Sequence, residues 1–180
     1  PVNSPLGRTV TAMFPRDHAH QHGVFSAWVK TDYDGQTVVF WNLAKKSGRV
    51  LHQQVLSTFA NAESAGFEVD LIHRIETDPP KDVLRERWKV TVFPTDGTYH
   101  GFDLATTQTA LTDLPLTVAE YHYGGVALRG PARWLTARDG GGRSHPDFER
   151  EPSGFLNDLG SQRIEGNHQH AKWIALWGEV

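Results

Sequence analysis

The chain has 180 residues, no cysteine and a formal net charge of −3. This length fits one domain with a core of its own, and the missing cysteines exclude disulfides and thiolate metal sites. The charge balance disfavours nucleic acid or an anionic membrane surface as a partner, because both are bound through basic patches. Apolar runs are short, so we expect neither a membrane-spanning helix nor a signal peptide, and cytoplasmic and exported locations stay open.

Short segments rich in Val, Ile, Thr, Phe and Trp alternate with turn residues along the chain, which predicts β-strands. A helical period never persists beyond two turns, so helices should be few and short. The predicted fold is all-β, an antiparallel β-sandwich with long loops that forms a single domain over residues 1–180. The predicted strands are 24–31, 37–42, 50–59, 67–75, 84–93, 99–107, 123–129 and 171–177.

Turn signals separate several of these strands. Residues 32–35 and 95–97 carry Asp and Gly between apolar runs and predict hairpin turns. Residues 138–152 carry three consecutive glycines and two prolines, which predicts a long surface loop.

The strand at 84–93 has the clearest alternation of apolar and polar side chains. Successive side chains of a strand point to opposite faces, so we expect Trp88, Val90 and Val92 to face the core. The charged side chains between them should then face water.

The densest polar cluster is the run Asp-His-Ala-His-Gln-His-Gly ahead of the first predicted strand. If it is extended, His18, His20 and His22 point to one face, and two imidazoles at this spacing can share a metal ion. The outer pair would lie about 13 Å apart in a straight strand, so three ligands need a turn at Ala19 or Gly23. We predict a site here, with hydrogen-bonded structural histidines as the alternative.

A second cluster, Glu-Tyr-His-Tyr-Gly-Gly, begins at Glu120. Its paired glycines allow a ligand or backbone to approach closely. Glu120 and His122 should share a face as an acid and base pair, while Tyr123, Arg129 and Trp134 should bind the ligand, with the guanidinium as a donor fork. The alternative is that the aromatic residues are core residues and that Arg129 is a buried ion-pair partner.

Aromatic side chains elsewhere in the sequence are also candidates for ligand binding. Trp41, Trp134 and His52 are candidates for a sugar-stacking platform, because an aromatic face packs against the C–H face of a pyranose. The His-x-His spacing recurs at His168 and His170, where a hairpin loop is the better interpretation. Phosphate-binding loops, nucleophile elbows and His-Glu-x-x-His helices do not occur in the sequence.

Three segments together resemble the bacterial PmoA-like family, whose members often carry the label methane oxygenase. A run of the type Asp-His-Pro-His-His-Arg-Gly occupies the place of residues 17–23 in that family, and Gln21 and His22 depart from it. The resemblance implies a carbohydrate setting and a chain that lacks segments at both ends. The segments are 4–11 with 17–23, 121–125 with 129–131, and 166–167 with 171–173.

Together with this resemblance, the sequence predicts a carbohydrate-active domain of the two-sheet sandwich class that includes sugar mutarotases, and the resemblance implies that the chain is a truncated member of it. It would act on or bind a sugar or sugar-derived acid in a pocket shared by the histidine run and the Tyr-His-Tyr-Gly-Gly segment. His20 and His122 would transfer protons, and Glu120 would act as orienter or base.

Two alternatives come from other classes. The first is a metal-dependent oxygenase, as the family label implies, in which a divalent metal such as iron or copper is bound by His18, His20 or His22 with His122. The second is a non-catalytic carbohydrate-binding module, in which tryptophans stack on the sugar and the histidines are structural.

Overall fold

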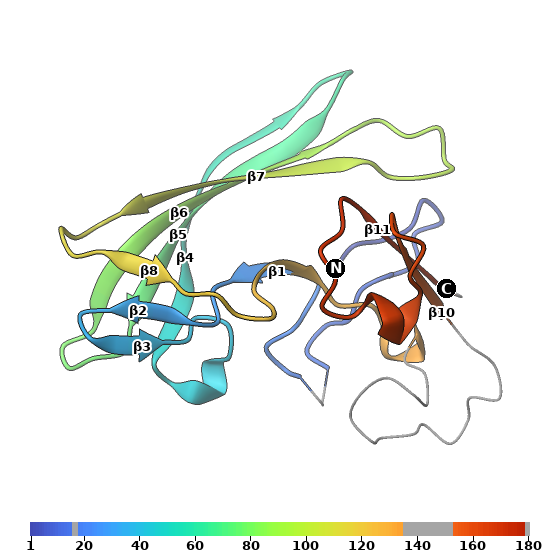
Figure 1. Ribbon diagram of the computed structural model, residues 1–180. Helices are drawn as coiled ribbons and strands as arrows, with labels where there is room; N and C mark the ends of the chain where they lie inside the picture. Colours follow the sequence, from blue (N-terminus) through green and yellow to red (C-terminus); the bar gives the residue numbers. More distant parts are fainter. Residues whose placement is uncertain (16–17, 135–152, 179–180) are drawn as a thin grey trace. The chain divides into compact units, whose positions relative to one another are not determined.

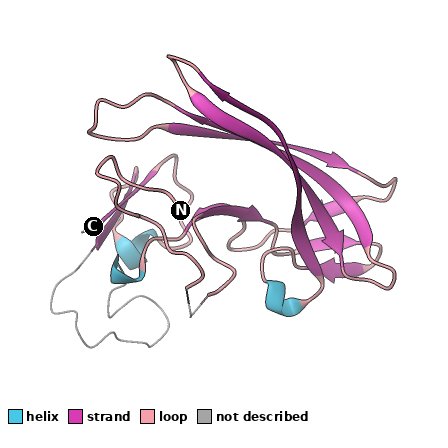
Figure 2. Cartoon of the chain, turned by 180° about the vertical axis from the view of Figure 1, so that it is seen from behind, coloured by secondary structure: helices cyan, strands magenta, loops and turns pink. Residues whose placement is uncertain are grey.

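The structure is a computed structural model that describes residues 1–15, 18–134 and 153–178. Over these residues the protein is all-β, with antiparallel sheets and only short 3-10 turns, as Figure 2 shows. The loop predicted at 138–152 lies outside the described residues. None of the described helical turns has the length and apolar character that crossing a membrane requires. The elements are β1 (Val24–Ala27), β2 (Thr31–Tyr33), β3 (Gln36–Val38), η1 (Leu43–Lys45), β4 (Gly48–Ala60), β5 (Ala65–Ile75), β6 (Lys81–Val92), β7 (Phe102–Ala110), β8 (Leu116–Val118), β9 (Gly125–Leu128), η2 (Ala132–Trp134), β10 (Ser153–Asn157), η3 (Arg163–Gly166) and β11 (Ile174–Gly178).

The chain divides into two compact units. We call them the central unit, Ser4–Gly7 with Phe25–Ala127, and the terminal unit, which comprises Pro1–Asn3, Arg8–Val24 and Leu128–Val180. The central unit contains the long strands, and the terminal unit contains the histidine run together with the β10–β11 hairpin.

The central unit is built on a four-stranded antiparallel meander in the order β4-β5-β6-β7. Its first turn is held by Asn61, whose side-chain oxygen accepts hydrogen bonds from the backbone of Glu63 and Ser64, the usual behaviour of a turn asparagine. A second, three-stranded sheet in the order β3-β2-β8 faces one end of the meander (Figure 1). The predicted Asp-Gly turn joins β2 to β3, so this part of the expected β-sandwich is confirmed.

The core lies where the two sheets meet. Val38 and Phe40, in and beside β3, pack with Ile75, Val83 and Leu84 at the β5–β6 end of the meander. All five side chains are buried, and apolar burial of this kind is the main favourable term in folding. The strands of the three-stranded sheet are only three residues long, so this sheet covers only the adjacent end of the meander.

The predicted alternation of inward and outward side chains is present along β6. The core, however, lies nearer the β5–β6 turn than we expected. Arg87 and Lys89 are exposed and Trp88 and Val90 are half-buried, as their opposite orientation requires. Val92 is 39% exposed, so its assignment to the core was wrong. The pattern identifies the inward face of a strand correctly, whereas burial also needs a second layer, and the short sheet does not reach this end.

The terminal unit contains a two-stranded antiparallel hairpin of β10 and β11. Asn157 ends β10 and is 1% exposed. Its side-chain oxygen accepts from the backbone of Leu159 and Ser161, and its amide donates to Gln169. A buried amide bonded in this way fixes the turn that leaves the strand.

Candidate functional site

The residues predicted from the sequence are divided between the two units. Each unit brings some of them together, and the common pocket of the histidine run and the Tyr-His-Tyr segment stays a prediction. The terminal unit holds His18, His20, His22, Arg129 and Trp134, and the central unit holds Trp41, His52, Glu120, His122 and Tyr123.

The histidine run is a turn rather than an extended strand. The backbone N–H of Gln21 donates to the carbonyl of His18 at 2.8 Å, so Ala19 and His20 occupy the middle of a β-turn. Gly23 follows with φ +67°, a conformation that glycine adopts without strain. The rule that alternate side chains of a strand point to one face therefore does not apply to these histidines.

The turn separates the side chains of the three histidines. The rings of His18 and His20 are 5.9 Å apart between centroids, whereas His22 stacks on Phe14 at 4.6 Å. Within the described residues no group of three His, Asp or Glu side chains is arranged to hold a metal ion. Asp17 lies outside the described residues.

His20 has an electrostatic environment that favours its neutral form. Partial burial lowers the pKa of its imidazole, and the charges of His18 and Arg129 lower it further. Arg129 donates to the side-chain oxygen of Gln21 at 3.2 Å. The loop thus holds an uncharged imidazole beside a guanidinium, and this arrangement can accept a proton or orient a polar group.

The densest aromatic cluster of the central unit is the segment at residues 121–123. Tyr121 and Tyr123 contact edge to face at 5.0 Å, and the ring of His122 lies 4.2 and 4.5 Å from theirs. Trp41 contacts Tyr123 at 5.5 Å and is itself packed on Phe25. We call Tyr121, His122 and Tyr123 the aromatic surface, because the two tyrosines are 44% and 47% exposed while Trp41 beneath is 8% exposed.

The glycine pair that follows sets the course of this segment. Gly124 and Gly125 have φ of +150° and +74°, so other residues would be strained there. A Cβ on Gly124 would contact Val29 at 3.5 Å, and one on Gly125 would contact Trp28 at 3.6 Å. The backbone therefore passes directly over the Trp28–Val29 segment, which places the preceding rings at the surface.

The predicted acid and base pair of Glu120 and His122 requires an extended strand through both residues, and the structure has none at these positions. Strand β9 begins only at Gly125, and residues 119–124 have no regular structure, so alternation does not place Glu120 and His122 on one face. Both residues are exposed. Burial and a hydrogen bond with Tyr121 raise the pKa of Tyr123, so its hydroxyl stays protonated and able to donate.

The remaining predicted positions have different surroundings. His52 is exposed on β4, where it pairs with Leu71. Trp134 lies in η2 and packs on backbone, since a Cβ on Gly130 or Gly178 would fall 2.8 or 2.3 Å from its ring. Trp134 is half-buried and fills space between glycine backbones.

One functional candidate that sequence reasoning missed is a buried polar pair between β5 and β6. Nε2 of His73 lies 2.8 Å from Oε2 of Glu86, and Gln108 donates to the other carboxylate oxygen at 3.1 Å. Burial alone would raise the pKa of Glu86, but its hydrogen bonds, led by that from His73, hold the pKa below its usual value. The alternation of side chains along β6 could have indicated that Glu86 is buried, because Glu86 lies on the same inward face as Leu84 and Trp88.

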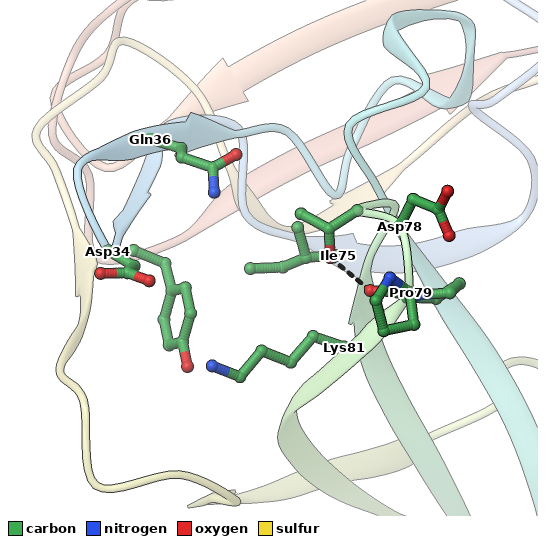
Figure 3. Close-up of a pocket in the computed structure, with 9 residues that line it drawn as sticks. Asp34, Gln36, Ile75, Asp78, Pro79 and Lys81 are labelled. Carbon is green, nitrogen blue, oxygen red and sulfur yellow. Dashed lines mark hydrogen bonds between the residues drawn. The ribbon is translucent and has the colours of Figure 1, made fainter.

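A second missed feature is a cavity of about 460 Å³ in the central unit, between the β2–β3 turn and the β5–β6 turn (Figure 3). The Asp-Gly and Pro-Pro pairs predict the two turns, but no local sequence pattern indicates that the two turns face each other. Its lining residues are Tyr33, Asp34, Gln36, Ile75, Thr77, Asp78, Pro79, Pro80 and Lys81.

Comparison with known proteins gives a family without an assigned activity. No curated protein and no solved structure matches the chain. A model described as a family of unknown function (DUF6807) matches residues 1–180. The chain therefore belongs to this family of unknown function, DUF6807.

Proposed function

We propose that the central unit binds a carbohydrate, which stacks on the aromatic surface. The observation that carries this proposal is the exposure of Tyr121 and Tyr123 above a buried Trp41. Exposed rings with fixed orientation offer apolar faces to the C–H groups of a pyranose, and little side-chain freedom is lost when the sugar binds.

Polar groups next to the rings supply the hydrogen bonds that a sugar needs. The two tyrosine hydroxyls donate and accept, and the imidazole of His122 contacts both rings. Glu120 adds an exposed carboxylate one residue before the surface. Recognition of a sugar combines apolar stacking with a few directed hydrogen bonds, and this segment offers both kinds of group.

Binding to a panel of mono- and oligosaccharides, measured by isothermal titration calorimetry, tests the proposal. Replacing Tyr121 and Tyr123 together by Ala should weaken binding by about tenfold or more, since two stacking contacts are lost. Tyr99→Ala is the matched control, because Tyr99 is also exposed, at 67%, but lies in the β6–β7 loop. Equal losses in the two variants, or no binding of any sugar by the unmodified protein, would contradict the proposal.

Product analysis in the same experiment separates binding from turnover. If the bound sugar is converted, His122→Ala should reduce turnover more than affinity, because a proton-transfer group acts mainly in the transition state. If no product forms, the chain is a binding domain. In both cases stacking on the aromatic surface is required.

A further inference from the structure

The cavity between the β2–β3 and β5–β6 turns is lined in part by Lys81, which packs over Tyr33. Tyr33 is 2% exposed and donates through its hydroxyl to Thr112 at 3.1 Å. The amino group of Lys81 lies over the same tyrosine, 5.0 Å from the centre of its ring. The N–H donors of this ammonium group lie beside the cavity, because Lys81 is one of its lining residues.

The polar groups around this space include both hydrogen-bond donors and hydrogen-bond acceptors. Figure 3 shows Gln36 and Lys81 extending toward the space between the turns, with Asp34 at its edge. The neighbouring Tyr33 hydroxyl and the carboxylate of Asp34 raise the pKa of Lys81, so the amino group stays charged. The lining thus offers ammonium donors, an amide that both donates and accepts, and the carboxylate acceptors of Asp34 and Asp78.

The rest of the lining is apolar. Ile75 is buried at the base, and Pro79 and Pro80 form part of the wall. Thr77 donates to the carbonyl of Pro79 at 2.9 Å, which uses its hydroxyl within the turn itself. A ligand that fits must therefore combine C–H surface with several closely spaced hydroxyls.

We propose that this cavity binds one neutral polyhydroxylated molecule of the size of a monosaccharide or a cyclitol. Hydroxyls of such a ligand can accept from Lys81 and donate to the carboxylates of Asp34 and Asp78. An anion fits less well, because the carboxylates of Asp34 and Asp78 oppose the charge of Lys81, the one cation among the lining residues. An amine fits less well, because Lys81 already occupies the face of Tyr33.

Two-dimensional NMR titration with glucose, galactose, mannose and myo-inositol tests this proposal. We expect shifts of the backbone amides around Lys81 and Asp34 with at least one of these compounds. Lys81→Met should weaken that binding by about tenfold while keeping the length of the side chain. Lys89→Met is the control, since Lys89 is on the same strand but its amino group lies over Phe59, 5.8 Å from the ring centre. The affinity of this variant for the compound should not change.

The test distinguishes this cavity from the aromatic surface, with which it shares no residue. The protein with Tyr121 and Tyr123 replaced by Ala should keep the shifts around Lys81. Gln36→Leu gives a second test at an exposed position, where folding should be unaffected. The proposal is overturned if none of the four polyols shifts these amides, if acetate or phosphate shifts them instead, or if both cavity variants bind like the unmodified protein.

Discussion

The two ends of the four-stranded meander have similar apolar sequences and different surroundings. At the β5–β6 turn, Val83 and Leu84 are 1% and 7% exposed under the second sheet. At the opposite end Phe67 is 40% and Phe102 is 41% exposed, although their strands are equally regular. The comparison shows that strand patterning sets which way a side chain points, while the length of the facing sheet sets how far it is buried.

The largest effect should come from the buried pair at the covered end. His73→Ala leaves the carboxylate of Glu86 without its main hydrogen-bond donor at 1% exposure, so we expect a loss of about 3–5 kcal/mol in the free energy of unfolding. Urea denaturation measures it. His52→Ala is the control, because His52 is exposed on the neighbouring strand, and a similar loss there would contradict the contrast.

Acid should weaken the covered end through the same pair. The pKa of Glu86 is lower in the folded protein than its ordinary value of 4.5. Its stabilising contribution is therefore present above pH 4.5 and is lost as the pH falls through the folded value. Glu86→Gln should flatten this part of the curve of stability against pH, and an unchanged curve would show that another carboxylate is responsible.

A substitution at the middle of the meander should have an intermediate effect. Trp88 is half-buried, so Trp88→Ala should cost about 2 kcal/mol, below the range of about 3–5 kcal/mol that fully buried aromatic residues show. Thermal unfolding with calorimetry measures the difference. A loss above that range would mean that a further layer covers this position.

The smallest effect should be found at the open end. Val92→Thr removes little buried apolar area because Val92 is 39% exposed, and Thr also favours strands, so we expect a change within about 0.5 kcal/mol. The same substitution at Val83, which is 1% exposed, is the matched comparison and should cost clearly more. Equal effects would remove the distinction between the two ends.

Sequence patterns predicted the four long strands because each of them contains a long run of residues that favour strands. The strands at 50–59, 67–75, 84–93 and 99–107 all overlap observed ones. The prediction missed β8 and β10, which have three and five residues, and merged β1 with the start of β2. Short strands are specified by distant partners, as when β8 pairs with β2, and a local pattern contains little of that information.

The candidate site was predicted less well, for a related reason. The segment containing His122 and Tyr123 was identified by its composition, but its geometry depends on a turn rather than on a strand. The partners of Lys81 in the cavity come from another turn about 45 residues away in sequence, so no window of the chain contains both.

The glycine pair behind the aromatic surface bears on how ligand preference can evolve. Tyr121 and Tyr123 are exposed, so exchanging one ring for another changes the chemistry of the surface at little cost in folding free energy. Gly124, at φ +150°, has no such freedom. Descendants of this chain can therefore diversify at two positions and keep the same backbone, so a new specificity need not pass through a poorly folded ancestor.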